Sequence, residues 1–218
     1  MSIFKAVLHE LCKSRLVQRT EWRFAQGSAY RRFSTQSQLW RREGVLETYS
    51  KKICLLGDFA VGKTSLVRRF VHNRFDDQYI STLGVKVSRK TVVIPHHDAV
   101  IEMNLMVWDL AGGQQANPVA VSYLRGAAGA LLVCDLTRAE SLPSLDRYAT
   151  ALRQVMPGAQ FVVAANKTDL VEQQQVTTHQ IADAAAQLNA PYYLTSAKVG
   201  DAVDKAFRQL ATLLLNQR

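Results

Sequence analysis

Residues 52–64 read KICLLGDFAVGKT, and this stretch decides the fold prediction. Its first half is a short apolar run ended by glycine, which is typical of a buried strand. Its second half fits the pattern G-x-x-x-x-G-K-[ST], in which Gly57 and Gly62 let the chain curl until backbone N–H groups face phosphate oxygens. The stretch therefore predicts a strand, a phosphate-binding loop and a helix, in that order.

The loop also carries side chains that suit a nucleotide's phosphate chain. Lys63 can reach the terminal phosphates, and the helix that begins near Gly62 adds its positive end. The hydroxyl of Thr64 is a hard oxygen ligand of the kind that Mg²⁺ takes. The predicted nucleotide-binding loop comprises Gly57, Asp58, Phe59, Ala60, Val61, Gly62, Lys63, Thr64 and Ser65.

Strand-like and helix-like segments alternate along the chain after residue 50. Strands are expected at 52–57, 86–94, 100–108, 129–136, 160–166 and 190–197, and helices at 63–75, 141–156, 178–189 and 201–217. A turn at 95–98 would join the second and third strands into a hairpin. The alternation predicts an α/β fold with a mostly parallel sheet covered by helices on both faces. Ligands of such sheets bind beyond the carboxyl ends of the strands.

Two polar segments follow expected strands and add to the candidate site. Asp109 can hold Mg²⁺ through water, and Gly112 can offer its N–H to a terminal phosphate. In the segment NKTD, residues 166–169, the Asp169 carboxylate can accept hydrogen bonds from both N1–H and the 2-amino group of guanine. Adenine lacks that pair of donors, so a site built around this contact would reject ATP. Lys167 can lay its aliphatic stem over the base, and Asn166 can tie this loop to the phosphate loop.

The chain resembles Ras-superfamily small GTPases, and most closely the Rab-like branch, over about residues 51–217. The resemblance rests on GDFAVGKTS, FDDQYISTLGV, WDLAGG, NKTD and TSAK, which occur in the family's order. It implies a P-loop NTPase G domain with a six-stranded sheet, one strand antiparallel, and five helices. It also implies a molecular switch in signalling that binds GTP and GDP with Mg²⁺ and hydrolyses GTP.

The resemblance also implies roles for individual positions. Phe75 resembles the aromatic residue that packs against guanine, and Tyr79 resembles a tyrosine that covers the nucleotide. Thr82 resembles the threonine that binds Mg²⁺ and the terminal phosphate only in the GTP state. The loop whose backbone reads the guanine oxygen would be Ser196, Ala197 and Lys198. The implied metal ligands are Thr64, Thr82 and, through water, Asp109; Lys63 and Thr82 would stabilise charge during hydrolysis.

The implied switch consists of two loops, which carry Thr82 and Gly112. The terminal phosphate and Mg²⁺ would hold both loops, and loss of that phosphate would release them. Effector and regulator proteins are therefore the expected partners, and they would bind these loops.

Two positions depart from the family pattern. Relatives usually carry, directly after the glycine that Gly112 resembles, a glutamine that orients the attacking water. Here Gly113 takes that place and Gln114 comes one position late, so we expect slow hydrolysis, with Gln114 as a candidate substitute. The alternative function is a GTP-binding interaction module with negligible hydrolysis. Phe59 stands where many relatives have a small residue; it could hinder a partner's arginine or pack outward.

The first 50 residues form a separate, basic segment. They contain nine Lys and Arg against four Glu, a net charge of +5 out of +9 for the 218-residue chain. Three interpretations remain open: an amphipathic helix within residues 1–20 that docks weakly on a membrane or partner, an organelle transit peptide, or an extension of little role. We therefore predict two parts, a basic and otherwise loosely ordered extension at 1–50 and a GTPase domain at 51–218.

Composition also bears on membrane insertion, nucleic-acid binding and cellular location. No apolar run reaches 18 residues, so a transmembrane segment is not expected, and no nucleic-acid-binding module is recognisable. The three cysteines are far apart, which favours small buried thiols in a reduced compartment, and no cysteine after Cys134 could take a prenyl group. The expected location is the cytoplasm, with the mitochondrion or another organelle as the alternative. The lack of a lipidation site fits a soluble, prokaryotic-type relative.

Overall fold

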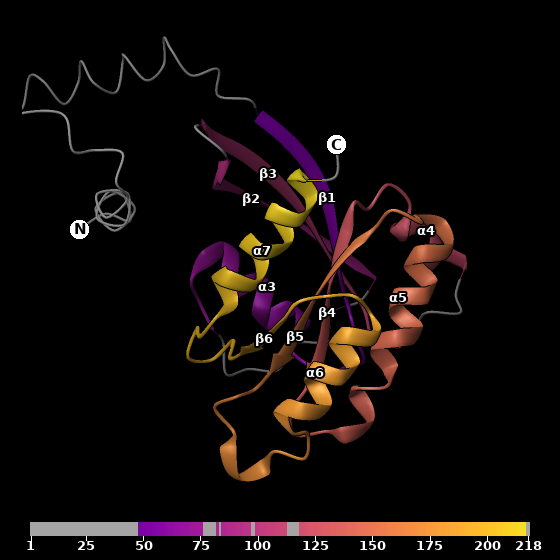
Figure 1. The fold of residues 1–218 in the computed structure, drawn as a ribbon, viewed down its shortest axis with the longest axis vertical. Coiled ribbons are helices and arrows are strands. Elements are labelled where there is room, and N and C mark those ends of the chain that lie inside the picture. The colour runs from indigo at the N-terminus through magenta and orange to yellow at the C-terminus, as the bar shows by residue number, and fades with distance from the viewer. Residues whose placement is uncertain (1–47, 76–81, 83, 97–98, 113–117, 217–218) are drawn as a thin grey trace, which may run out of the picture. The chain divides into compact units, whose positions relative to one another are not determined.

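A six-stranded sheet forms the centre of the fold in the computed structural model, which describes residues 48–75, 82, 84–96, 99–112 and 118–216. These residues fall within one compact unit, Leu46–Arg218. The strand order is β2-β3-β1-β4-β5-β6, and only the β2–β3 pair is antiparallel (Figure 1). The strands are β1 (Thr48–Leu56), β2 (Val85–His96), β3 (Ala99–Leu110), β4 (Gly129–Asp135), β5 (Gln160–Asn166) and β6 (Tyr192–Thr195).

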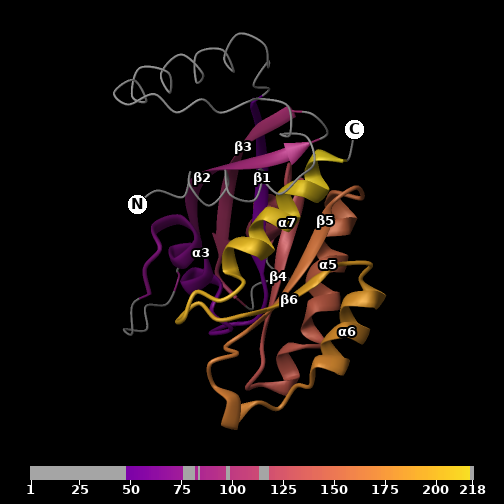
Figure 2. The same ribbon diagram turned by 60° about the vertical axis from the view of Figure 1, so that its left-hand side comes forward.

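Helices cover both faces of this sheet. Two helices, α3 (Lys63–His72) and α7 (Val203–Leu215), pack on one face, where the rings of Phe70 and Phe207 stack with centroids 4.0 Å apart. The other face carries α4 (Pro118–Leu124), α5 (Ser144–Val155) and α6 (Thr178–Gln187). Figure 1 labels all three, and Figure 2 shows α5 and α6 from a second side. Two short 3₁₀ helices, η2 (Ala139–Ser141) and η3 (Val171–Gln173), lie in connections. The predicted α/β G-domain fold is confirmed.

The burial pattern explains the layers. Every residue of β4 is buried because helices lie above and below it, as an inner parallel strand requires. In β1, Ile53 and Leu55 enter the core under α3 and α7, whereas Cys54 enters the core under the other three helices. Cys54 and Cys134 are free, buried thiols whose pKa burial raises to about 12, so their predicted role as small core residues is confirmed.

Some element boundaries differ from the prediction for local reasons. Helix α3 ends at His72 rather than at 75, because Asn73 adopts a left-handed conformation (φ 52°) and its N–H donates to the Arg69 carbonyl at 2.9 Å. Pro95 was expected in a turn but lies in β2, paired with Val100. Proline is tolerated there because β2 is an edge strand.

Two helical segments differ more. The helix expected at 141–156 begins later, after Pro143, as α5, and its expected first residue, Ser141, ends η2 instead. The resemblance implies five helices, but the local patterns located only four; α4 is the fifth, and its only local signal is the proline at its first position. None of the helices in the described ranges is both long enough and apolar enough to cross a membrane.

Candidate functional site

The site lies at the carboxyl ends of the parallel strands. The loop 57–62 follows β1, Asp109 lies near the end of β3, and Asn166 ends β5. The loop that carries Ser196 follows β6. Parallel strands bring these positions to one edge of the sheet, so the candidate residues that the sequence identified separately lie together.

Close contacts explain both glycines of the phosphate loop. A Cβ on Gly57 would lie 2.2 Å from the Val133 carbonyl oxygen, and one on Gly62 would lie 2.2 Å from Asn166 Nδ2. Gly62 (φ 99°) and Ala60 (φ 62°) are both left-handed, and such alternation turns successive N–H groups toward one side. No side chain caps the start of α3, so the loop leads into an uncapped helix end that can receive an anion.

Lys63 folds back over this loop. Its Nζ donates to the carbonyl oxygens of Gly57 at 2.9 Å and Asp58 at 2.7 Å, and the residue is only 7% exposed. Burial lowers the pKa of Lys63 to about 8, although the nearby carboxylates of Asp109 and Asp58 oppose this shift. The amine is therefore held, largely desolvated, at the loop.

Three side-chain oxygens meet at the end of β3. Thr64 Oγ1 donates to Asp109 Oδ2 at 2.6 Å, so in its 2.7 Å contact with Thr82 Oγ1 the Thr82 hydroxyl is the donor. Asp109 is 1% exposed, and its Oδ1 has no hydrogen-bond partner among the described residues. Burial raises the pKa of Asp109, and the Thr64 hydrogen bond works against that rise. Two hydroxyls and a buried carboxylate form a hard donor set that fits Mg²⁺.

Gly112 approaches the phosphate loop closely. A Cβ at this position would lie 2.5 Å from the Phe59 nitrogen and 2.7 Å from the Asp58 oxygen. Ala111 also donates its N–H to the Gly84 carbonyl at 3.0 Å, which joins the segments that carry Gly112 and Thr82. The close approach therefore requires glycine sterically, and the phosphate contact of its N–H remains a prediction.

Asn166 joins the two halves of the site. Its Nδ2 donates to the Val61 carbonyl at 3.0 Å, and its Oδ1 accepts from the Ala197 N–H at 3.2 Å. The residue is 2% exposed, so these contacts are shielded from water. The phosphate loop, the NKTD loop and the loop after β6 are therefore held in one arrangement.

The carboxylate expected to read the base is itself oriented. Asp169 Oδ1 accepts a 2.5 Å hydrogen bond from Ser196 Oγ. Ser196 Oγ in turn accepts from the Val199 N–H at 3.1 Å. The hydroxyl therefore restrains one oxygen of a carboxylate, a group that can accept from two donors on one base edge.

Sequence reasoning missed Arg69, which supports the same region. From α3, its Nε donates to the Ala197 carbonyl at 2.8 Å and its Nη2 to the Lys198 carbonyl at 2.5 Å. Arg69 was one of several basic residues on this helix, and nothing in the local pattern distinguished it. Its partners lie 128 and 129 positions away, so only the folded structure reveals the contact.

Of the other site residues predicted from sequence, the structure describes some and not others. Phe75 packs half-buried against the core under α3 and α7. Phe59 is 54% exposed. Lys167 directs its ammonium group to Asp135, 2.6 Å away, rather than remaining unpaired beside the base site. Tyr79, Gly113 and Gln114 lie outside the described residues, as do residues 1–47.

Comparison with known proteins identifies the family. Residues 52–216 match the Ras family. The chain is 36% identical to Ras-related protein Rab-1C of Dictyostelium discoideum, over 74% of this chain and 79% of the relative. It is 37% identical to GTP-binding protein ypt5 of Schizosaccharomyces pombe (77% and 79%) and 39% identical to Ras-related protein Rab7 of Drosophila melanogaster (73% and 78%). With the strand–loop–helix of 52–64 at the edge where the other motifs converge, these matches show that the chain belongs to the Ras family, as a Rab-like small GTPase.

Proposed function

We propose that this protein is a guanine-nucleotide switch that binds GTP and GDP with Mg²⁺ and hydrolyses GTP slowly. The observation that carries the proposal is the convergence of Lys63 with the oxygens of Thr64, Thr82 and Asp109 beside an uncapped helix start. The amine and the N–H groups would bind the phosphates, while the three oxygens would hold the metal. The relatives named GTP-binding or Ras-related support this assignment.

Base selection is assigned to the loops that Asn166 joins. The Asp169 carboxylate would accept hydrogen bonds from N1–H and the 2-amino group of guanine. The backbone of residues 196–198 would face the guanine oxygen. Phe75, Tyr79 and the Lys167 stem would contact the base or cover the nucleotide. The Ser196 hydroxyl that orients Asp169 supports this role. ATP is disfavoured because it would leave the carboxylate without donors.

Mg²⁺, when bound, would neutralise charge that develops on the transferred phosphate. Lys63 would place positive charge at the same phosphates, and Thr82 would sense whether the terminal phosphate is present. The Ala111 N–H donates a hydrogen bond to the Gly84 carbonyl. Release of the segment that carries Thr82 would therefore be transmitted to the segment that carries Gly112. Effectors and regulators would distinguish the two nucleotide states at these segments.

Slow hydrolysis rests on Gly113, which has no side chain to orient water. The substitution Gly113→Gln is expected to raise the single-turnover rate of GTP hydrolysis by about tenfold, because a well-placed group that orients or activates water contributes roughly 10²–10⁴-fold and an unoptimised loop would recover part of that. The measurement is phosphate release from GTP-loaded protein after addition of Mg²⁺.

The single variant Gln114→Ala tests whether Gln114 already orients the attacking water. A wild-type rate that does not change with Gly113→Gln but falls with Gln114→Ala would assign the water to Gln114 and would refute the proposed defect at position 113. No turnover in any variant, with GTP still bound, would favour the alternative function, an interaction module whose bound GTP fixes a partner-binding surface.

The buried amine of Lys63 makes nucleotide affinity depend on pH. Its pKa is about 8 in this structure, and phosphate groups beside it would favour the charged form, so binding takes up a proton at higher pH. GDP affinity is expected to fall from pH 8 to pH 9 by up to about tenfold. Titration between pH 7 and 9, with calorimetry in buffers of different ionisation enthalpy, measures both the fall and the proton uptake.

The stability of the nucleotide-free fold should change in the opposite direction. Lys63 in the unfolded chain keeps its proton up to about its ordinary pKa of 10.5, so the unfolded state binds more protons between pH 8 and 10.5. The fold therefore gains stability as pH rises through that window.

The control for the affinity measurement is Lys63→Arg, whose guanidinium stays charged, so GDP affinity should lose its pH dependence. Constant GDP affinity of the wild type from pH 7 to 9 would contradict this account.

The other assignments remain predictions. These are the division at residue 50, a cytoplasmic location, docking through residues 1–20, the absence of a nucleic-acid partner and a prokaryotic-type origin. The relatives quoted above are all eukaryotic, so they lend the last of these no support.

A further inference from the structure

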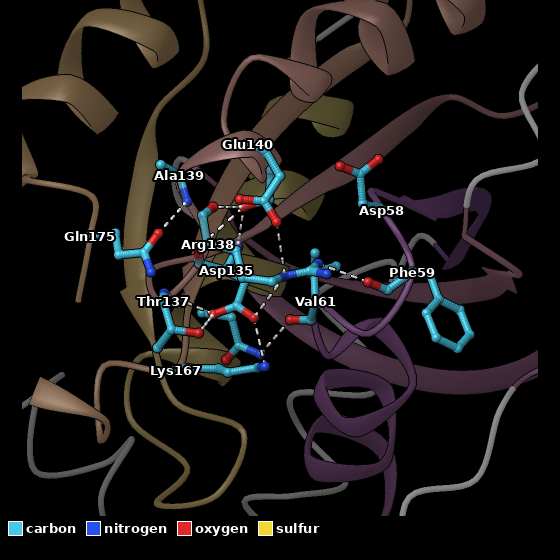
Figure 3. Close-up of polar contacts among 12 residues, drawn as sticks. Asp58, Phe59, Val61, Asp135, Thr137, Arg138, Ala139, Glu140, Lys167 and Gln175 are labelled. Carbon is cyan, nitrogen blue, oxygen red and sulfur yellow. Dashed lines mark hydrogen bonds and ion pairs between the residues drawn. The ribbon is translucent and has the colours of Figure 1, made fainter. Parts of the chain in front are cut away.

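An arginine that neither the motifs nor the proposed chemistry uses lies against the phosphate loop. Arg138 follows β4, and its Nη2 donates to the Phe59 carbonyl oxygen at 2.8 Å (Figure 3). Its Nε lies 3.4 Å from Asp135 Oδ2 and 3.9 Å from Glu140 Oε1, distances of ion pairs rather than of tight hydrogen bonds. The shortest of these contacts of the guanidinium is therefore with the phosphate loop's main chain.

Asp135 connects this arginine to the loop expected to bind the base. The residue is completely buried, and its Oδ1 accepts from the N–H and the hydroxyl of Thr137 at 2.9 and 2.7 Å. Its Oδ2 pairs with Lys167 Nζ at 2.6 Å as well as with Arg138. A buried carboxylate is stable only when such partners compensate its lost hydration. One carboxylate thus pairs with a cation from the turn after β4 and with a cation from the NKTD loop.

The backbone of Arg138 is held too. Its N–H donates to the Asp135 carbonyl at 3.0 Å, and its own carbonyl accepts from Ser141 Oγ at 2.7 Å. The Asp135 N–H also donates to Ser141 Oγ, at 2.9 Å. The turn therefore presents the guanidinium from a fixed base, so the contact with Phe59 requires little further ordering.

Anchoring the Phe59 carbonyl has a consequence for the next N–H. In a planar trans peptide the C=O and the following N–H point in opposite directions. Arg138 fixes the oxygen of the Phe59–Ala60 peptide on the side of the loop that faces the turn after β4, so the Ala60 N–H is turned to the opposite side. Ala60 has φ 62°, an uncommon conformation for a residue other than glycine that surrounding contacts must maintain.

We propose that Arg138 is a positioning residue for the nucleotide's phosphates: it fixes the Phe59–Ala60 peptide so that the Ala60 N–H faces the phosphate chain, and through Asp135 and Lys167 it couples this loop to the base-binding loop. The proposal rests on the proposed function, guanine-nucleotide binding. It concerns a contact made through the peptide, not a direct contact between arginine and phosphate.

The test compares Arg138→Gln, Arg138→Lys and the control Arg153→Gln by competition binding of GDP and GMP, and by ³¹P resonances of bound GDP. Arg153 is the control because its Nη2 also donates to a backbone carbonyl, that of Leu188 at 2.7 Å, which belongs to the C-terminal cap of α6 and not to the phosphate loop. Lysine keeps a charge beside Asp135 but lacks the second N–H arm that reaches Phe59.

We expect both Arg138 variants to lose about tenfold in GDP affinity. Their loss of GMP affinity should be smaller, because GMP places fewer phosphate oxygens in the loop. A ³¹P resonance of bound GDP should also shift. Arg153→Gln should do none of these. Equal losses for GDP and GMP with unchanged ³¹P resonances would overturn the proposal, since a role in fold stability alone gives that result. Variants that bind GDP like the wild type would also overturn it. A wild type that binds no guanine nucleotide would instead overturn the proposed function itself.

Discussion

The substitution Asp169→Asn is expected to lower GTP affinity by roughly 10²- to 10⁴-fold and to make xanthosine triphosphate the preferred nucleotide. The loss corresponds to two hydrogen bonds to a charged group at about 1.5–3 kcal/mol each. An asparagine turns an NH₂ group toward the 2-amino group of guanine, so two donors meet. Xanthine carries a carbonyl at that position and accepts the new hydrogen bond.

The structure makes this a local substitution. Asp169 Oδ1 accepts from Ser196 Oγ, and the Asn carbonyl oxygen can accept the same hydrogen bond, so the loop after β6 keeps its support. The measurement is competition of GTP, xanthosine triphosphate and ATP against a fluorescent nucleotide. Asp183→Asn is the control, because Asp183 pairs with His179 on the exposed surface of α6 and should leave every affinity unchanged. An unchanged preference for GTP in Asp169→Asn would remove this account of base selection.

The parts of the site that could be predicted from sequence are those whose chemistry is local. The phosphate loop is recognisable because its glycines, Lys63 and Thr64 are consecutive, and a strand pattern precedes them and a helix pattern follows. Asp109 and the NKTD segment are recognisable because each follows an apolar strand. Parallel pairing then brings them together without further information, since it aligns the strands' carboxyl ends.

The supporting contacts could not be predicted because they join distant residues to backbone atoms. Arg69 donates to carbonyls of the loop after β6, and Arg138 to the carbonyl of Phe59, 79 positions away. Any residue supplies a backbone carbonyl, so the sequence marks neither partner. Asp135 reads as the polar end of a strand, and its complete burial between two cations appears only in the fold.

The largest effect on stability is expected from Gly57→Ala. The new Cβ would lie 2.2 Å from the Val133 carbonyl oxygen and 3.3 Å from Val61 Cγ2, and the residue has φ 150°. Val133 belongs to a fully buried inner strand held by β1 and β5, so it cannot move aside. Strain and overpacking together should lower the free energy of unfolding by about 2–5 kcal/mol and abolish tight GDP binding.

Gly126→Ala separates the two contributions. Gly126 also has a positive φ, 75°, but nothing lies within 4 Å of its would-be Cβ, so only backbone strain of about 1 kcal/mol should appear. Denaturant unfolding without added nucleotide gives both free energies, and GDP titration gives the effect on binding. If Gly57→Ala lost no more stability than Gly126→Ala and still bound GDP tightly, the phosphate loop would be able to withdraw from β4. Its shape would then come from its own backbone preferences and from Asn166 and Arg138, rather than from close packing on the strand.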